Sequence, residues 1–172
     1  LRDLIQQVKT VKPLESKTIQ IAGGEPTLRD DLLEIIRIAK ETGFSHVQIN
    51  TNGIKLAESV DYCQSLKNEK VDTIYLNFSG IKKTTNPLIE SHKKVIENCK
   101  KVNLNIILVP TIIADENLCE AGKIVRFAIE NCDSIKGVHF QLFATDVLAS
   151  NVTECEKEKQ HLDYGKLFQF IE

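Results

Sequence analysis

Hydrophobic and polar positions along this chain alternate between two periods. Short runs that change residue by residue, as in strands, are followed by longer runs whose apolar residues recur every three or four positions, as in helices. The pattern predicts five strands, near residues 18–22, 46–50, 73–78, 105–109 and 137–141. It predicts helices over about 1–11, 28–39, 56–66, 88–101 and 116–130, and a short one near 164–171. Strands that alternate with helices of this length predict βα units, and hence an α/β fold with a parallel sheet.

The predicted strands also divide into an apolar face and a polar face. In the strand near 73–78, Ile74, Leu76 and Phe78 alternate with Tyr75, Asn77 and Ser79, and three other strands divide in the same way. A parallel sheet covered on both faces would show nearly continuous apolar runs, and a filled TIM barrel would carry Val, Ile and Leu inside. An edge strand with a solvated face would explain one such pattern. Four strands favour a curved sheet with helices outside and a concave, ligand-lined inner face.

Three consecutive strands end in small polar residues and glycine. The endings are Gly23-Gly24-Glu25-Pro26-Thr27, Asn50-Thr51-Asn52-Gly53 and Asn77-Phe78-Ser79-Gly80. Ligands of α/β sheets bind at the carboxyl ends of the strands, so these loops are expected to share one rim. Two glycines would suit an ordinary turn, but they also let a backbone approach a ligand closely. Together the three endings suit a zwitterionic, nucleoside-bearing ligand, with Glu25 and backbone carbonyls for its ammonium group.

The stretch from Ile19 to Arg29, with its Gly-Gly-Glu-Pro loop, resembles the GGEP strand and loop of the radical SAM superfamily. Thr51-Asn52-Gly53 and the strand end at Leu76–Gly80 are similar to that family's next two strands, and the resemblance covers about 18–141. It implies a partial (βα)6, TIM-like barrel that binds S-adenosylmethionine (SAM) and a [4Fe–4S] cluster. Enzymes of this family cleave SAM reductively to a 5′-deoxyadenosyl radical, which abstracts a hydrogen atom from the substrate. Segments 43–53, 108–111, 127–131 and 137–141 are similar to the branch of tetraether lipid synthase and its pterin-methylase-like relatives.

The resemblance also implies roles for individual residues. Four residues would hold the methionine amine of SAM: Gly23, Gly24, Glu25 and Pro26. The candidates for its carboxylate and ribose, at the next two strand ends, are Thr51, Asn52, Asn77 and Ser79. Val109 and Pro110 would lie near the adenine, with Gln141 at the far rim. Ser79 stands where the branch tends to have Asp, and residues 142–146 also depart from it, so the branch's substrate is not transferred to this chain.

The cysteines do not supply the family's cluster motif. All five are scattered, without a C-x2-C or C-x3-C spacing: Cys63, Cys99, Cys119, Cys132 and Cys155. No metal site is therefore predicted within the chain, and the ligands of the cluster, C-x3-C-x2-C, are expected outside it. The chain lacks methionine and starts in a helical pattern, so we expect a fragment, truncated at its N-terminal βα unit and inactive alone. The alternative is a non-catalytic, barrel-derived binding module that has lost these cysteines.

Other features set the wider expectations. Residues 1–143 are predicted to form the partial core, and 144–172 a polar tail or linker with a short helix. A conventional βα-barrel aldolase or isomerase would place a lysine or paired acids at inner strand ends, and none is seen. The net charge of -2 does not indicate a basic surface for nucleic acid. No apolar run approaches the roughly 20 residues that span a bilayer. A cytoplasmic enzyme is expected, with a small-molecule substrate and a reductant such as ferredoxin or flavodoxin.

Overall fold

The computed structural model describes residues 1–10, 16–113, 116–143 and 163–171. Its main sheet has five parallel strands in the order β1 (Thr18–Ile21), β2 (His46–Thr51), β3 (Thr73–Asn77), β4 (Asn105–Val109) and β6 (Ile135–Val138). Two short parallel strands, β5 (Thr111–Ile112) and β7 (Gln141–Leu142), form a second sheet. Neighbouring strands of the main sheet follow one another along the chain and are all parallel, as the alternation of strands and helices predicts. The sheet forms one arc of a βα barrel, as the family resemblance implies.

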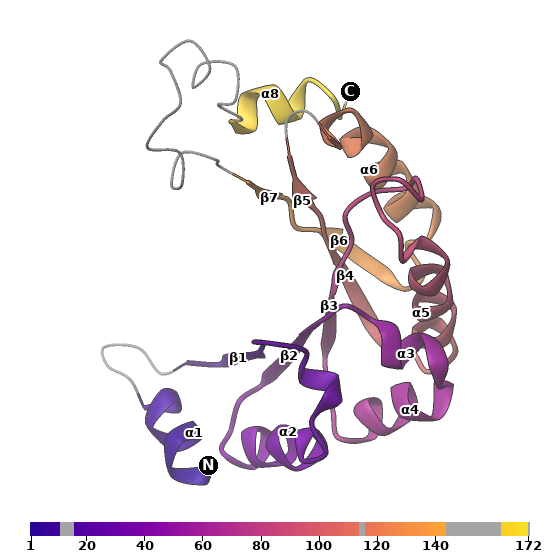
Figure 1. The fold of residues 1–172 in the computed structure, drawn as a ribbon. Coiled ribbons are helices and arrows are strands. Elements are labelled where there is room, and N and C mark those ends of the chain that lie inside the picture. The colour runs from indigo at the N-terminus through magenta and orange to yellow at the C-terminus, as the bar shows by residue number, and fades with distance from the viewer. Residues whose placement is uncertain (11–15, 114–115, 144–162, 172) are drawn as a thin grey trace.

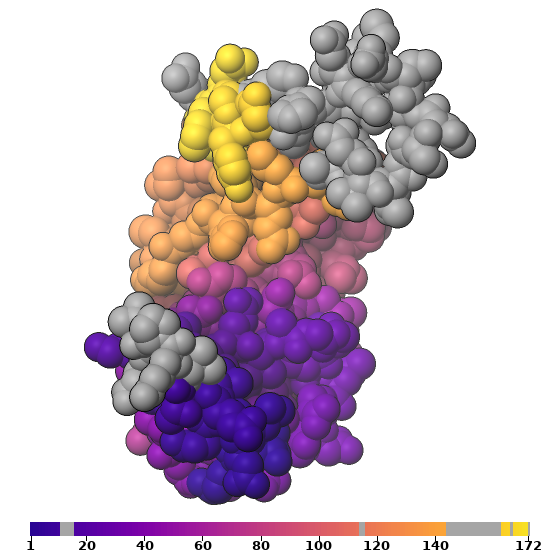
Figure 2. Space-filling view, turned by 90° about the vertical axis from the view of Figure 1, so that its left-hand side faces the viewer, coloured from indigo at the N-terminus to yellow at the C-terminus, as the bar shows by residue number. Residues whose placement is uncertain are grey.

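Helices cover one side of this arc. The crossovers carry α2 (Leu32–Glu41), α3 (Ile54–Glu58), α4 (Val60–Asn68), α5 (Ile89–Lys101) and α6 (Ala121–Glu130), with 3-10 turns η1 (Pro26–Leu28) and η2 (Leu118–Glu120). The sheet curves with α2 to α6 along its convex side, while α1 (Arg2–Lys9) and α8 (Tyr164–Phe168) lie at opposite ends (Figure 1). Figure 2 views the molecule from the concave side, with the indigo N-terminal elements below and the yellow α8 above.

The two faces of the sheet differ in burial, as the alternation of side chains predicts. Ile49, Ile74 and Ile106 are neighbours across three strands and are fully buried under the helices. On the opposite face, Asn50 and Tyr75 are neighbours in the same way and remain partly exposed. The apolar core therefore lies between sheet and helices, and the polar face is the concave one.

Several predicted elements differ in extent from those observed. The helix expected over 116–130 begins at Ala121, after η2, and the one expected near 164–171 ends at Phe168. The strand expected over 137–141 is two strands, β6 and β7, which pair with β4 and β5 respectively. The helix expected over 56–66 is divided at Ser59, which is extended (φ -145°) and whose hydroxyl accepts a hydrogen bond from the Tyr62 amide as the N-cap of α4. The helix expected from residue 28 begins at Leu32, because the residues before it form η1.

The C-terminal helix packs against the rest of the molecule. Leu167 on α8 is only 1% exposed and belongs to the same apolar core as Ile124 of α6. Residues 144–162, most of the predicted polar tail, lie outside the described residues. Within the described ranges, no helix is long and apolar enough to cross a membrane.

Candidate cofactor-binding site

Glu25 joins the first two loops of the rim. It follows β1, and its Oε1 accepts hydrogen bonds from the amide (3.0 Å) and hydroxyl (2.6 Å) of Thr27 and from the Thr51 hydroxyl (2.6 Å). Its Oε2 accepts one from the Asn52 amide at 2.8 Å. A single carboxylate therefore fixes the shape of its own loop and fastens that loop to the end of β2.

These bonds also keep Glu25 ionised. Burial alone would raise the pKa of its carboxyl group, but the hydrogen bonds from Asn52, Thr27 and Thr51 lower the pKa below its ordinary value. Thr51 is only 1% exposed, because it continues the apolar face of β2, and its Oγ1 also accepts the Gly53 amide at 3.1 Å. The threonine thus supports the loop from beneath, and Oε2, with a single donor, keeps capacity for a second one.

His92 on α5 connects the second loop to the third. Its Nδ1 lies 3.0 Å from Asn86 Nδ2, and its Nε2 lies 3.0 Å from the Asn52 carbonyl. The Asn86 amide is oriented by its Oδ1, which accepts from the Leu88 amide, and its Nδ2 also donates to the Gly80 carbonyl. Nδ1 must therefore accept, and the neutral ring donates from Nε2 to Asn52.

Neutral His92 makes the stability of the protein depend on pH. Burial lowers the pKa of His92, and the hydrogen bond to Asn52 raises it by less. In the unfolded chain, His92 takes up a proton as the pH falls below the ordinary histidine pKa of 6.5, whereas in the folded protein it does so only at a lower pH. The free energy of unfolding is therefore highest above pH 6.5 and falls as the pH drops below that value. We expect His92→Gln to flatten the fall in melting temperature between about pH 7 and 5. An unchanged slope in the variant would show that another group causes the fall.

Two further buried side chains hold the third and fourth loops. Glu120 accepts the amides of Ile81 (2.7 Å) and Lys82 (3.2 Å) on Oε2 and the Thr85 hydroxyl (2.9 Å) on Oε1. Asn117 donates from Nδ2 to the carbonyls of Ser79 (2.7 Å) and Thr111 (2.8 Å). Sequence reasoning missed both residues, because each lies 38 or 39 positions along the chain from the part of the third loop that it holds.

The predicted site residues fall into two groups. Those on the exposed or half-exposed rim are Gly23, Gly24, Glu25, Asn52, Asn77, Ser79 and Gln141. Those buried beneath it are Pro26, Thr51, Val109 and Pro110. The glycines have φ angles of 97° and 51°, and a Cβ on either would meet no atom within 4 Å, so their backbone is open to a ligand.

The concave face also contains an unpaired acceptor. Asn50 Oδ1 is buried and has no hydrogen-bond partner among the residues that the structure describes. A buried carbonyl oxygen without a partner costs about 1–3 kcal/mol, so the position favours a bound donor. Together with the open glycine backbone and the exposed amide and hydroxyl groups of Asn77 and Ser79, this donor set fits a zwitterionic nucleoside such as SAM.

The described residues offer no comparable site for a metal. No three His, Cys, Asp or Glu side chains in the described ranges converge as metal ligands. Cys63 and Cys99 are buried on the helix side of the sheet, and Cys119 and Cys132 are exposed near the ends of α6. Cys155 lies outside the described residues.

Comparisons with known proteins identify relatives of this chain in sequence and in fold. A family profile described as "Radical SAM superfamily" matches residues 1–128. The 7,8-dihydro-6-hydroxymethylpterin dimethyltransferase of Methanocaldococcus jannaschii is 47% identical over 130 residues, 72% of this chain and 26% of that protein. A probable GTP 3′,8-cyclase of Sulfurisphaera tokodaii is 32% identical over 120 residues, 66% of this chain and 37% of that protein. The chain thus spans well under half the length of either relative.

A solved structure shares the fold. The structure titled "Native anSMEcpe with bound AdoMet and Kp18Cys peptide" has a TM-score of 0.67 to this one, covering 97% of this chain and 48% of that chain at 15% identity. The partial barrel that the family resemblance implies is confirmed by this likeness and by the five-stranded parallel sheet. With the family profile matching most of its length, the chain belongs to the radical SAM superfamily.

Proposed function

We propose that this chain binds SAM at the rim formed by the carboxyl ends of β1 to β4, and that it supplies this part of the site in a radical SAM enzyme. The observation that carries the proposal is the Glu25 network, which fixes an open Gly-Gly backbone beside a row of polar side chains. A preorganised site of this kind binds its ligand without first having to order its own loops.

Each part of SAM has a matching set of groups on this rim. The carbonyls of Gly23 and Gly24 and the second acceptor site of Glu25 Oε2 suit the methionine ammonium. The side chains of Asn77 and Ser79 suit the carboxylate and ribose. Val109, the partner of Asn77 across β3 and β4, suits the adenine. We assign Thr51 to the support of Glu25 rather than to direct contact with the ligand.

The [4Fe–4S] cluster of the family supplies the electron for reductive cleavage of SAM. The described residues offer no ligand set for it, so we propose that its cysteines lie outside them. What this chain contributes is the binding and orientation of SAM. In the complete protein we propose that the electron comes from a ferredoxin or flavodoxin. The relative named as a pterin dimethyltransferase supports a small organic molecule as the substrate.

Asn77→Ala is expected to weaken the binding of SAM about 10-fold, because a hydrogen bond to a charged group contributes about 1.5–3 kcal/mol. Asn77 is exposed at the end of β3, so its loss should leave the fold intact. The matched control is Gln48→Ala, on the same concave face but one strand away and farther from the rim. Equal losses in the two variants, measured by calorimetric titration with SAM, would argue against a role for the rim.

The activity itself is tested in the protein that contains this chain. Anaerobic reconstitution with iron and sulfide, followed by a reductant, should yield 5′-deoxyadenosine from SAM, measured by chromatography. A cluster-loaded protein that binds SAM but forms no 5′-deoxyadenosine would overturn the enzyme and favour a binding module.

A further inference from the structure

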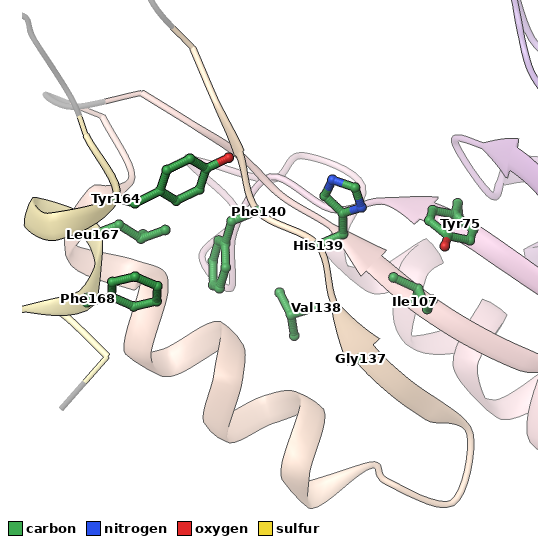
Figure 3. Close-up of a pocket in the computed structure, with 9 residues that line it drawn as sticks. All are labelled: Tyr75, Ile107, Gly137, Val138, His139, Phe140, Tyr164, Leu167 and Phe168. Atoms are coloured by element: carbon green, nitrogen blue, oxygen red, sulfur yellow. The ribbon is translucent and has the colours of Figure 1, made fainter.

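A cavity of about 400 Å³ opens on the concave side of the molecule, next to the proposed SAM rim. Strands β3, β4 and β6 form one wall, and α8 forms the opposite wall (Figure 3). Tyr75 precedes Asn77 by two residues on the same face of β3, so the cavity begins one layer below the residues assigned to SAM. None of the bonds that hold the rim involves a side chain of this cavity.

Aromatic rings dominate both walls. Tyr75 and His139 meet edge to face, with ring centroids 6.4 Å apart and planes at 69°. Tyr164 and Phe168 reach from α8, and Phe140 lies between the two sides (Figure 3). Such rings attract other aromatic systems in stacked or edge-to-face arrangements, beyond the area that they bury.

The polar side chains of the cavity are few, namely those of Tyr75, His139 and Tyr164. Its lining contains no Lys, Arg, Asp or Glu. The hydroxyls of Tyr75 and Tyr164 and the ring nitrogens of His139 have no hydrogen-bond partner within the described part of the chain, and all belong to residues that line the cavity. A mostly apolar pocket with a few convergent polar groups is the usual form of a small-molecule site.

We propose that this cavity binds an uncharged, planar heteroaromatic group of the substrate and holds it beside SAM. The inference rests on the proposed function and adds the chemical class of the substrate. The aromatic walls favour a flat ring system, and the hydroxyls and imidazole favour one whose edge carries nitrogen or oxygen. Cationic side chains would favour a triphosphate by contrast, and the lining offers no Lys or Arg.

Gly137 provides a direct way to block the cavity. It lies in β6 opposite Ile107, lines the cavity, and a Cβ built on it meets no atom within 4 Å. Gly137→Phe should therefore fill the space with a residue that favours strands, without a clash in the backbone. Gln48→Ala is again the control, since Gln48 lies on the same face but outside the cavity.

The probe is pterin, whose own fluorescence reports binding through its anisotropy. We expect saturable binding that Gly137→Phe and Tyr75→Ala each weaken at least 10-fold, while Gln48→Ala changes it less than twofold. Melting curves of the variants establish that each is folded. Wild-type binding that the two cavity variants leave unchanged, or no binding at all, would overturn the inference.

Competition separates this inference from the proposed function. GTP should not displace the probe, and SAM should bind without displacing it. Displacement by SAM would make the cavity the adenine site and overturn its assignment to substrate. Pterin binding in a chain that fails to bind SAM would contradict the proposed function and leave an aromatic site in place.

Discussion

Glu25→Gln is expected to weaken SAM binding at least about 30-fold and to destabilise the fold by about 3 kcal/mol, from charge-assisted hydrogen bonds worth about 1.5–3 kcal/mol each. The carboxylate accepts four hydrogen bonds, from Thr27, Thr51 and Asn52, divided between its two oxygens. A glutamine has only one acceptor oxygen, and its amino group would face at least one donor. The loop that carries Gly23 and Gly24 would then lose the connection that orients it.

Glu58→Gln is the control for this prediction. Glu58 ends α3 close to the same loops and is exposed, so the variant removes the same charge without removing the network. SAM affinity is measured by calorimetric titration, and stability by denaturant unfolding. If both variants weaken SAM binding equally, charge alone is responsible and the network is not what organises the site.

Gly53→Ala is expected to destabilise the protein by about 2–4 kcal/mol, the sum of a left-handed backbone and an overpacked core. Gly53 has a φ of 81°, and a Cβ there would lie 2.6 Å from Leu76 Cδ1 and 2.9 Å from Val95 Cγ2. Both contacts are with fully buried side chains that have little room to move. The backbone of Asn52, whose amide donates to Glu25 and whose carbonyl accepts from His92, would move with it.

Gly43→Ala separates the cost of the left-handed backbone from the cost of overpacking. Gly43 follows α2 with a φ of 97°, but its nearest neighbour to a Cβ is the flexible end of Lys9, at 3.8 Å. This variant therefore carries the backbone cost alone, about 1–2 kcal/mol. The free energies of unfolding in urea are compared, and a loss at Gly53 no larger than at Gly43 would show that the loop relaxes around the added methyl group.

Much of the fold could be predicted from the sequence because strand periodicity is local. The alternation around Ile74 and Asn77 was enough to assign the buried and concave faces, and the same parity puts Thr51 on the buried side with Ile49. The extent of β6 could not be predicted in this way. It ends at Val138, and the chain continues as β7, which pairs with β5 in the second sheet. The register of β6 against β4 also shifts by one residue, because Ile106 pairs with Ile135 but Ile107 pairs with Gly137.

The side chains that hold the rim loops together could not be predicted from the sequence. His92 has no other histidine or cysteine at a metal-ligand spacing, and its sequence context is that of an ordinary helix residue. Its ring nevertheless bonds to the carbonyl of Asn52, 40 positions away in the chain. Glu120 similarly holds amides 38 and 39 residues earlier. These contacts depend on where each crossover helix comes to lie on the sheet, and that placement is set by packing rather than by a motif.

Binding of SAM at a rim organised by Glu25 can be observed residue by residue, in a titration of the 15N-labelled chain with SAM followed by two-dimensional NMR. We expect saturable shifts of the amides of Gly23, Gly24, Asn52, Asn77 and Ser79, reduced in Glu25→Gln but retained in Glu58→Gln. Shifts that are absent from these residues, or that gather on the helices of the convex side, would contradict binding at this rim.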